Sequence, residues 1–312
     1  MTGVYLNRLS TALGELREEV EQAATVTAPA GLRDAGFRWH HRASPDTDAF
    51  ALACRAVDAL APEPARVGAL VHATCLPTSV NLGSEASFRA SGDVKHLMEF
   101  PAARLIERYG FADAFPVGLH QQACTGFIGS LRTAAWILNA EVDVEQVLCV
   151  TADRFPGGAR YEQAYNLISD GAAAALVSRE PVGFRVIAAH HIANGALAAA
   201  GDSAVLGSFF AWMIRLLREL FARARIGAER VSWLVPQNTH RHAWPILART
   251  LGIAAERVWC PTLPTAGHVI AADNALNLME LQQSGRLRAG DVLCLPMMGF
   301  GLNLQAVLLE AV

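Results

Sequence analysis

An excess of positive charge is what this 312-residue sequence most clearly lacks. Its formal net charge at pH 7 is −3, from 26 Lys and Arg residues against 29 Asp and Glu residues. Proteins that bind nucleic acid or an anionic membrane surface through charge need a basic patch or a basic excess. We therefore expect neither nucleic acid nor a membrane among the partners of this protein.

Membrane-spanning runs, a secretory signal and paired cysteines are absent as well. No apolar run is long enough to cross a bilayer, and no basic segment followed by an apolar core opens the sequence. The cysteines form neither a CxxC pair nor the spacing of a zinc site: Cys54, Cys75, Cys124, Cys149, Cys260 and Cys294. This pattern argues against a disulfide framework and against a metal centre. We expect a cytoplasmic protein with reduced thiols and no bound metal.

One of these cysteines, Cys124, lies where a loop of small residues gives way to a predicted helix. Apolar residues follow it at helical spacing, from Phe127 to Leu138. The unpaired N–H groups and the dipole at a helix N-terminus favour a thiolate, which is the nucleophilic form of cysteine. The alternative is an inert buried cysteine, a common state in an apolar protein. A nucleophilic Cys124 needs a base, so the remaining sequence must supply one.

Hydrophobic periodicity along the chain predicts alternating helices and buried strands. We expect helices at 46–60, 98–109, 206–225 and 268–283. We expect strands at 66–75, 115–119, 146–151, 170–177, 230–236, 291–296 and 301–309. Residues 1–43 are largely polar, and we expect them to be irregular.

The second half of the sequence repeats the plan of the first. Asp291-Val-Leu-Cys-Leu-Pro296 echoes Gln146-Val-Leu-Cys-Val150, and each segment lies between a helix and a further apolar strand. The duplication predicts an α/β protein with two similar halves, residues 1–178 and 179–312. Cys124 and His268 then occupy equivalent loop-to-helix junctions where the halves meet. Chance similarity between buried strands is the alternative, and the matching order of several elements argues against it.

Four segments together resemble the β-ketoacyl-acyl carrier protein synthase III branch of the thiolase superfamily. They are Gln122-Ala-Cys-Thr-Gly-Phe127, Ile168–Val177, Trp233-Leu-Val-Pro236 and Gly285–Gly301. The resemblance covers nearly the whole chain in the right order. It implies a five-layer αβαβα thiolase fold, a homodimer and an acyl group carried as a thioester on Cys124. It also implies that backbone N–H groups of Cys124 and of the Met298-Gly299 loop hold the oxyanion of the tetrahedral intermediate.

The sequence departs from this family at two motifs. A condensing synthase III has a His directly after the Val-Pro of the second-half strand and an Asn in a later Gly-Asn motif. Here Gln237 and Asn238 follow Val235-Pro236, and the later motif is Gly267-His268. The His and the Asn have traded places. The chain is in this respect similar to the synthase III-like acyltransferases of specialised metabolism.

A cysteine, a histidine and a group that orients the histidine still form a set capable of acyl transfer. In this interpretation His268 takes the proton of the Cys124 thiol, and Asn238 fixes the tautomer of His268. Asp273 is a competing orienter, because an acidic residue can play this part in the resembling acyltransferases. Asp273 at the start of a helix is alternatively an ordinary partner of the helix dipole.

The resemblance also implies how the acyl donor binds. Trp39, Arg38 and Arg154 correspond to an entrance that grips the adenine and phosphates of coenzyme A, although arginines at a surface often have no such partner. The donor is then acyl-CoA or the phosphopantetheine thioester of an acyl carrier protein, and no tightly bound cofactor is expected. His240 either enters the site or caps a helix, and Cys75 lines the pocket or acts as a second nucleophile.

Three functional hypotheses remain open at this point. The first is an acyltransferase that passes an acyl group from Cys124 to an acceptor nucleophile. The second is a decarboxylative Claisen condensation with a malonyl-type thioester and a rearranged His/Asn pair. The third is an inactive scaffold partner of a heteromeric synthase. The fold and the nucleophile are common to all of them, so the site must decide.

Overall fold

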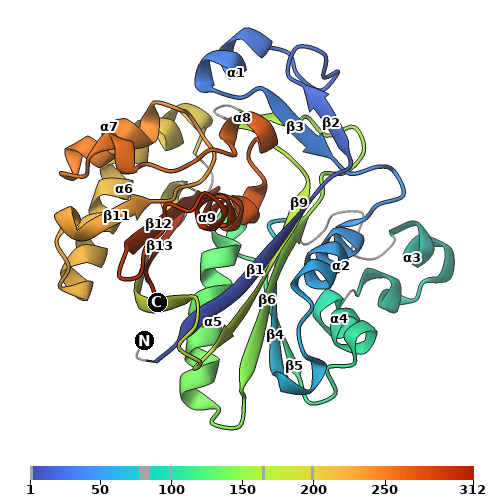
Figure 1. Cartoon of the computed structure of the whole chain (residues 1–312). Helices are drawn as coiled ribbons and strands as arrows, with labels where there is room; N and C mark the ends of the chain where they lie inside the picture. The colour runs from blue at the N-terminus through green and yellow to red at the C-terminus, as the bar shows by residue number, and fades with distance from the viewer. Residues whose placement is uncertain (1–2, 77–84, 99, 164–165, 198–199) are drawn as a thin grey trace.

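The computed structural model of the chain (Figure 1) describes residues 3–76, 85–98, 100–163, 166–197 and 200–312. Its helices are α1 (Pro29–Ala35), α2 (Ala49–Leu60), α3 (Glu85–Ser91), α4 (Pro101–Tyr109), α5 (Gly126–Ala140), α6 (Asp202–Ala224), α7 (Ala243–Thr250), α8 (Leu263–Ala266) and α9 (Asp273–Gln283). Its strands are β1 (Tyr5–Leu13), β2 (Leu16–Glu19), β3 (Trp39–Arg42), β4 (Val67–Ala73), β5 (Phe115–Leu119), β6 (Gln146–Asp153), β7 (Glu162–Gln163), β8 (Asn166–Leu167), β9 (Gly171–Ser178), β10 (Phe184–Ala193), β11 (Val231–Leu234), β12 (Val292–Gly299) and β13 (Asn303–Ala311). Among the helices in these ranges, none combines the length and the hydropathy that crossing a membrane requires.

The strand pairing shows the duplication that the sequence predicts. In the described residues nine strands form one sheet in the order β11-β12-β13-β10-β1-β9-β6-β4-β5. Strand β4 pairs parallel with β6, β6 pairs antiparallel with β9, and β9 pairs antiparallel with β1. Strands β11, β12, β13 and β10 repeat these three kinds of pairing in the same order. The division proposed after residue 178 falls at the end of β9.

Side chains that alternate along each central strand contact different layers of helices. In β6, Val147 packs in a cluster with α5 and α9, whereas Leu148 packs in another with α2 and α4. In β12, Leu293 joins the α5 and α9 cluster, whereas Cys294 packs with α6 and α7. Helices α5 and α9 therefore lie between two half-sheets, one made of β1, β9, β6, β4 and β5 and the other of β10, β13, β12 and β11. Both helices are near the middle of the molecule in Figure 1. The predicted five-layer αβαβα arrangement is confirmed.

The prediction that residues 1–43 are irregular is wrong. Strand β1 runs through the middle of the sheet and pairs with β9 from Tyr5 to Leu13. A bulge between Leu6 and Arg8 breaks the apolar alternation that would have revealed the strand. The polar side chain of Asn7 is accommodated because its amide donates to the carbonyls of Glu180 and Val182.

The helix expected at 268–283 begins five residues later than predicted, at Asp273. A short 3₁₀ turn at Ile270–Ala272 precedes it, and His268 lies in the connecting loop. Two backbone hydrogen bonds join this loop to the first half. The His268 N–H donates to the Leu167 carbonyl at 2.8 Å, and the Ser169 N–H donates to the His268 carbonyl at 2.8 Å. Pairing with the first half therefore sets the position of His268.

Candidate active site

Cys124 lies in a tight turn immediately before α5. The turn is a 3₁₀ helix at Ala123–Thr125, and Ala123 adopts a left-handed φ of 45°. That conformation costs about 1–2 kcal/mol for a residue with a Cβ, so the surrounding contacts must hold it. The Gln122 carbonyl accepts hydrogen bonds from Thr125 N at 3.0 Å and from Thr125 Oγ1 at 2.6 Å. The turn presents the thiol at the N-terminus of α5, as the sequence predicts.

A buried glutamine of the second half holds this turn from behind. Gln305 Nε2 donates to Gln122 Oε1 at 2.8 Å and to Thr125 Oγ1 at 2.9 Å. Arg132 Nη1 donates to Gln305 Oε1 at 2.7 Å, which satisfies the other end of the amide. Gln305 was not predicted as a site residue, although a polar residue inside the apolar run of β13 is a signal that marks it.

His268 and Asp273 form a buried pair. The distance between His268 Nδ1 and Asp273 Oδ2 is 2.5 Å, and both side chains are almost completely buried. Asp273 also accepts from Val269 N at 2.6 Å and from Asn238 N at 2.7 Å, so its carboxylate is fixed on three sides. Burial lowers the pKa of His268, but the charge and hydrogen bond of Asp273 and the neighbouring Cys124 outweigh burial and raise it. Asp273 is thus placed to orient the ring and to favour its protonated form.

The thiol of Cys124 contacts both Cys75 and His268. The hydrogen bond from the Cys75 thiol and then the hydrogen bond and charge of His268 lower the pKa of Cys124, although burial acts in the opposite direction. These opposite shifts of the two pKa values favour the thiolate form of Cys124 and the imidazolium form of His268. The direction is the one expected from the sequence, where the helix N-terminus favours a thiolate and His268 takes the thiol proton.

The side chain of Asn238 makes its hydrogen bonds with groups other than the His268 ring. Its Nδ2 donates to Thr262 Oγ1 and to the Gly267 carbonyl, both at 2.8 Å, and its Oδ1 accepts from Asn277 Nδ2 at 2.9 Å. The prediction that the Asn238 amide orients the His268 ring is therefore wrong. Asn238 braces the loop that carries His268 instead.

The backbone N–H groups predicted to hold the oxyanion differ in whether they are free to do so. A Cβ added to Gly299 would lie 3.1 Å from the Cys124 nitrogen, so this end of β12 closely approaches the Cys124 amide. The Met298 N–H, however, donates to Gln237 Oε1 inside the protein. Met298 is therefore not available as an oxyanion donor, which corrects the prediction for that residue.

A cavity of about 570 Å³ opens beside this site, next to Thr239 and Met298. Its walls come from α1, α6 and α7 and are mostly apolar: Leu32, Leu206, Phe209, Phe210, Ile246, His240 and His242. His240 thus lies on the cavity wall, and it does not touch the His268–Asp273 pair in any described hydrogen bond. The helix predicted at 206–225 is α6, and its residues Leu206, Phe209 and Phe210 form part of this wall.

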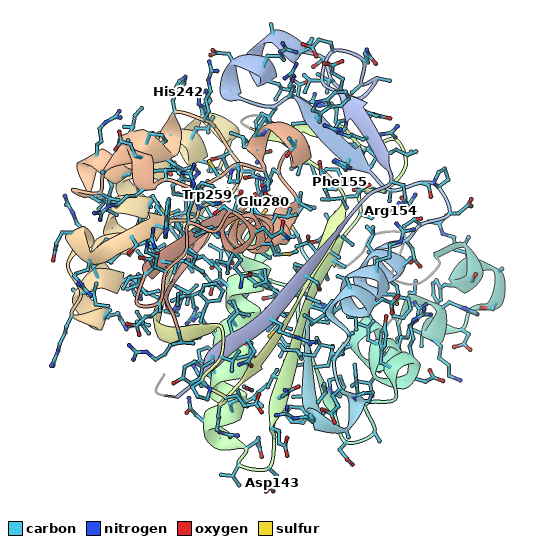
Figure 2. The ribbon with its side chains drawn as sticks, in the orientation of Figure 1. Asp143, Arg154, Phe155, His242, Trp259 and Glu280 are labelled. Atoms are coloured by element: carbon cyan, nitrogen blue, oxygen red, sulfur yellow. The ribbon has the colours of Figure 1, made fainter. Side chains whose placement is uncertain are left out.

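The three residues predicted to grip coenzyme A are not among the described residues that line this cavity. Arg38 is exposed, and Trp39 is half-buried with the Arg17 guanidinium 4.2 Å from its ring centroid. Arg154 Nη2 donates to the Pro45 carbonyl at 3.4 Å. Figure 2 shows Arg154 on the opposite side of the molecule from His242, which lies at the cavity. No cluster of His, Cys, Asp and Glu in the described ranges has the geometry to hold a metal ion.

The layered fold, with Cys124 at a helix N-terminus beside the buried His268–Asp273 pair, is that of a thiolase-type protein. Residues 120–195 match the family model of 3-oxoacyl-[acyl-carrier-protein] synthase III, and residues 221–311 match the model of its C-terminal part. Together these segments make up more than half of the chain. The chain belongs to the β-ketoacyl-acyl carrier protein synthase III family, a family of transferases and condensing enzymes, as a variant with rearranged His and Asn motifs.

Individual relatives agree with this assignment. The β-ketoacyl-[acyl-carrier-protein] synthase III of Chelativorans sp. (strain BNC1) is 26% identical over 305 residues, which cover 88% of each chain. The structure of the acyltransferase ChlB3 superimposes with a TM-score of 0.81 at 20% identity, covering 99% of this chain and 98% of that one. The 3-oxoacyl-[acyl-carrier-protein] synthase III of Aquifex aeolicus VF5 gives a TM-score of 0.77 at 20% identity, covering 98% and 99%. At such identities the structural matches establish the fold.

Proposed function

We propose that this protein is an acyltransferase that loads an acyl group from a thioester onto Cys124 and passes it to an acceptor nucleophile. The donor is acyl-CoA or the phosphopantetheine thioester of an acyl carrier protein. One observation carries the proposal: the 2.5 Å contact between His268 Nδ1 and Asp273 Oδ2, with the Cys124 sulfur hydrogen-bonded to the same ring. An ion pair of this kind is ready for nucleophilic attack and holds a proton for the leaving group.

The same groups account for both halves of a transfer cycle. In loading, Cys124 Sγ attacks the donor carbonyl, and backbone donors at Cys124 and near Gly299 stabilise the oxyanion. His268 gives its proton to the departing donor thiolate. In transfer, the neutral His268 takes the proton of the acceptor while the acceptor attacks the thioester, and Cys124 leaves as a thiolate. The cycle returns the imidazolium and the thiolate without a net change in the protein.

The apolar cavity suits the arm of such a donor. Its volume of about 570 Å³ lies within the range of small-molecule sites, and two of its lining residues, Thr239 and Met298, are chain neighbours of Asn238 and Gly299 at the reaction centre. We place the pantetheine arm and part of the acyl chain there, between α6, α7 and α1. Gripping of the adenine and phosphates by Trp39, Arg38 and Arg154 stays a separate expectation, since none of the three lines this cavity.

The oligomeric state, location and metabolic role that we propose are those expected from the resemblance to the family. We propose a homodimer that joins through the edge of β5, where Phe115 is 39% exposed and the sheet has no further strand among the described residues. A solution mass of twice the 33.4 kDa chain mass is expected, and a monomer would contradict this part. We further place the protein in the cytoplasm, in specialised polyketide or fatty-acid-like metabolism.

Cys124→Ala is expected to abolish acyl loading. Incubation of the wild-type protein with short and medium acyl-CoA thioesters, or with acylated carrier protein, should add one acyl mass in an intact-mass spectrum. The adduct should be absent in Cys124→Ala and unchanged in Cys260→Ser, a control cysteine of the second half. A wild-type protein that takes up no acyl group from any of these donors would support the inactive scaffold instead.

Decarboxylation of a malonyl thioester is expected to be absent. A rearranged pair would need the Asn238 amide beside His268 to stabilise an enolate, but Thr262, Gly267 and Asn277 occupy that amide. Release of labelled carbon dioxide from a malonyl thioester, with Cys124 already acylated, measures this directly. Carbon dioxide release that depends on His268 would favour the condensing enzyme over plain transfer.

A further inference from the structure

Cys75 lies against the nucleophile and helps to lower its pKa, but it transfers neither a proton nor an acyl group in the proposed cycle. It follows the end of β4, whose last residue, Ala73, is adjacent to Gly126: a Cβ added to Gly126 would lie 3.0 Å from the Ala73 Cβ. The Cys75 and Cys124 thiols share a hydrogen bond and pack on the same core cluster. Both are free thiols. Two reduced sulfurs are therefore in contact at the reaction centre.

A buried carboxylate fixes the position of Cys75. Asp153 Oδ1 accepts from Cys75 N at 2.8 Å, from Thr74 Oγ1 at 2.7 Å and from Leu76 N at 3.1 Å. Asp153 is the last residue of β6, and the turn that contains Cys75 follows β4. Because β6 pairs with β4, Asp153 and this turn lie at the same end of two neighbouring strands. The turn at Cys75 is consequently held by hydrogen bonds to the Asp153 side chain that do not depend on the substrate.

The two thiols differ in reactivity. The hydrogen bond to Cys124, burial and nearby negative charge raise the pKa of Cys75, whereas the pKa of Cys124 is lowered, so Cys124 forms the thiolate more readily. A thiolate attacks peroxide oxidants more readily than a thiol does, and the sulfenic acid that results condenses with a neighbouring thiol. Without such a neighbour the sulfenic acid is oxidised further, to forms that thiol reductants do not reverse.

We propose that Cys75 and Cys124 form a site of reversible oxidation, at which hydrogen peroxide links the two sulfurs in a disulfide that blocks acyl loading. Cys124 Sγ first attacks the peroxide, which leaves a sulfenic acid and a hydroxide that takes the His268 proton to become water. The Cys75 sulfur then displaces the sulfenic oxygen, and its proton leaves with that oxygen as a second water. Two thiol equivalents lose two electrons in total, and one peroxide gains them.

The disulfide is measured without any acyl donor, so the test stands apart from the proposed function. Purified protein is treated with hydrogen peroxide, and intact mass and non-reducing peptide mapping follow the products. We expect a loss of two hydrogens and a cross-linked pair of peptides that carry Cys75 and Cys124. Cys260→Ser, which alters another partly buried cysteine of the second half, should behave as the wild type does.

Recovery with dithiothreitol separates the paired site from simple damage. The loss of acyl loading as a readout rests on the proposed function. The oxidised wild-type protein should regain its full loading activity after reduction. Cys75→Ser and Cys75→Ala should instead gain two or three oxygens at Cys124 and should not recover. The proposal fails if peroxide leaves Cys124 unoxidised, if Cys124 oxidises without a cross-link to Cys75, or if both Cys75 variants recover as fully as the wild type.

Discussion

Asp273→Asn should slow acyl loading of Cys124 by about 10²–10⁴-fold, the range that an oriented acid–base group supplies. The carboxylate accepts from His268 Nδ1, Asn238 N and Val269 N at once. An amide has a single acceptor oxygen, so its NH₂ must face one of these donors. The ring then loses both its fixed orientation and the charge that keeps it protonated. Loading rates measured by quenched intact-mass spectrometry test this, and His268→Ala should lose at least about two orders of magnitude.

The pH profile distinguishes an electrostatic role of Asp273 from a structural one. In the wild type the pKa of Cys124 is lowered and that of His268 is raised, so loading should be constant between the two values. The rate falls at low pH as the thiolate is protonated, and at high pH as His268 loses the proton for the leaving group. Removal of the Asp273 charge lowers the pKa of His268 and should move the alkaline limb to lower pH.

Asp143→Asn is the matched control for this experiment. Asp143 is exposed at the edge of the molecule in Figure 2, far from Glu280 of α9. Its rate and pH profile should equal those of the wild type. If Asp273→Asn also keeps the wild-type rate and both limbs of the profile, Asp273 only stabilises the start of α9 and the proposed ion pair is incorrect.

Gly299→Ala should lower the loading rate by about 10²-fold, because it displaces the amide donors of the oxyanion. The new methyl carbon would lie 2.9 Å from Ala123 Cβ, 3.0 Å from the Gln122 carbonyl oxygen and 3.1 Å from the Cys124 nitrogen. Two of these atoms are backbone, so the turn that carries Cys124 must shift. Overpacking of this kind typically costs about 1–3 kcal/mol, and the melting temperature should fall as well.

Gly157→Ala provides the control, because a methyl group there meets no atom within 4 Å. We expect it to leave the loading rate and the melting temperature unchanged. Loading rate and thermal melting of the two variants are measured together, since a loss of rate beyond the loss of folded protein is the relevant signal. Wild-type behaviour of Gly299→Ala in both measurements would contradict the close approach of β12 to the Cys124 turn.

Local patterns were enough to predict the layers and the nucleophile. The helical spacing from Phe127 to Leu138 gave α5, and the echo between residues 146–150 and 291–296 gave the repeated half-sheets. These features follow from periodicity, because a residue's face on a helix or strand depends on its position in that element. Strand β1 escaped the same reasoning because its bulge interrupts the alternation.

The polar contacts of the site could not be obtained in this way. Asn238, Asp273 and Gln237 all belong to plausible motifs, and only the packing of the loops shows that Asp273 meets His268. The same packing commits the Asn238 amide to Thr262 and directs Gln237 to the Met298 N–H. Asp273 is only five residues from His268, but the partners of Asn238 and Gln237 are 24 and 61 residues away, so no local pattern shows which of these side chains is free to meet the ring.

By itself, the sequence determined the family, the five layers and the cysteine at the start of α5, because periodic burial and short motifs are local properties. The tertiary structure alone decided that Asp273, and not the Asn238 amide, contacts the His268 ring, where the apolar cavity lies and that Cys75 touches Cys124. Those outcomes depend on how the loops pack around the site, since such hydrogen bonds and thiol contacts form only once the core has packed.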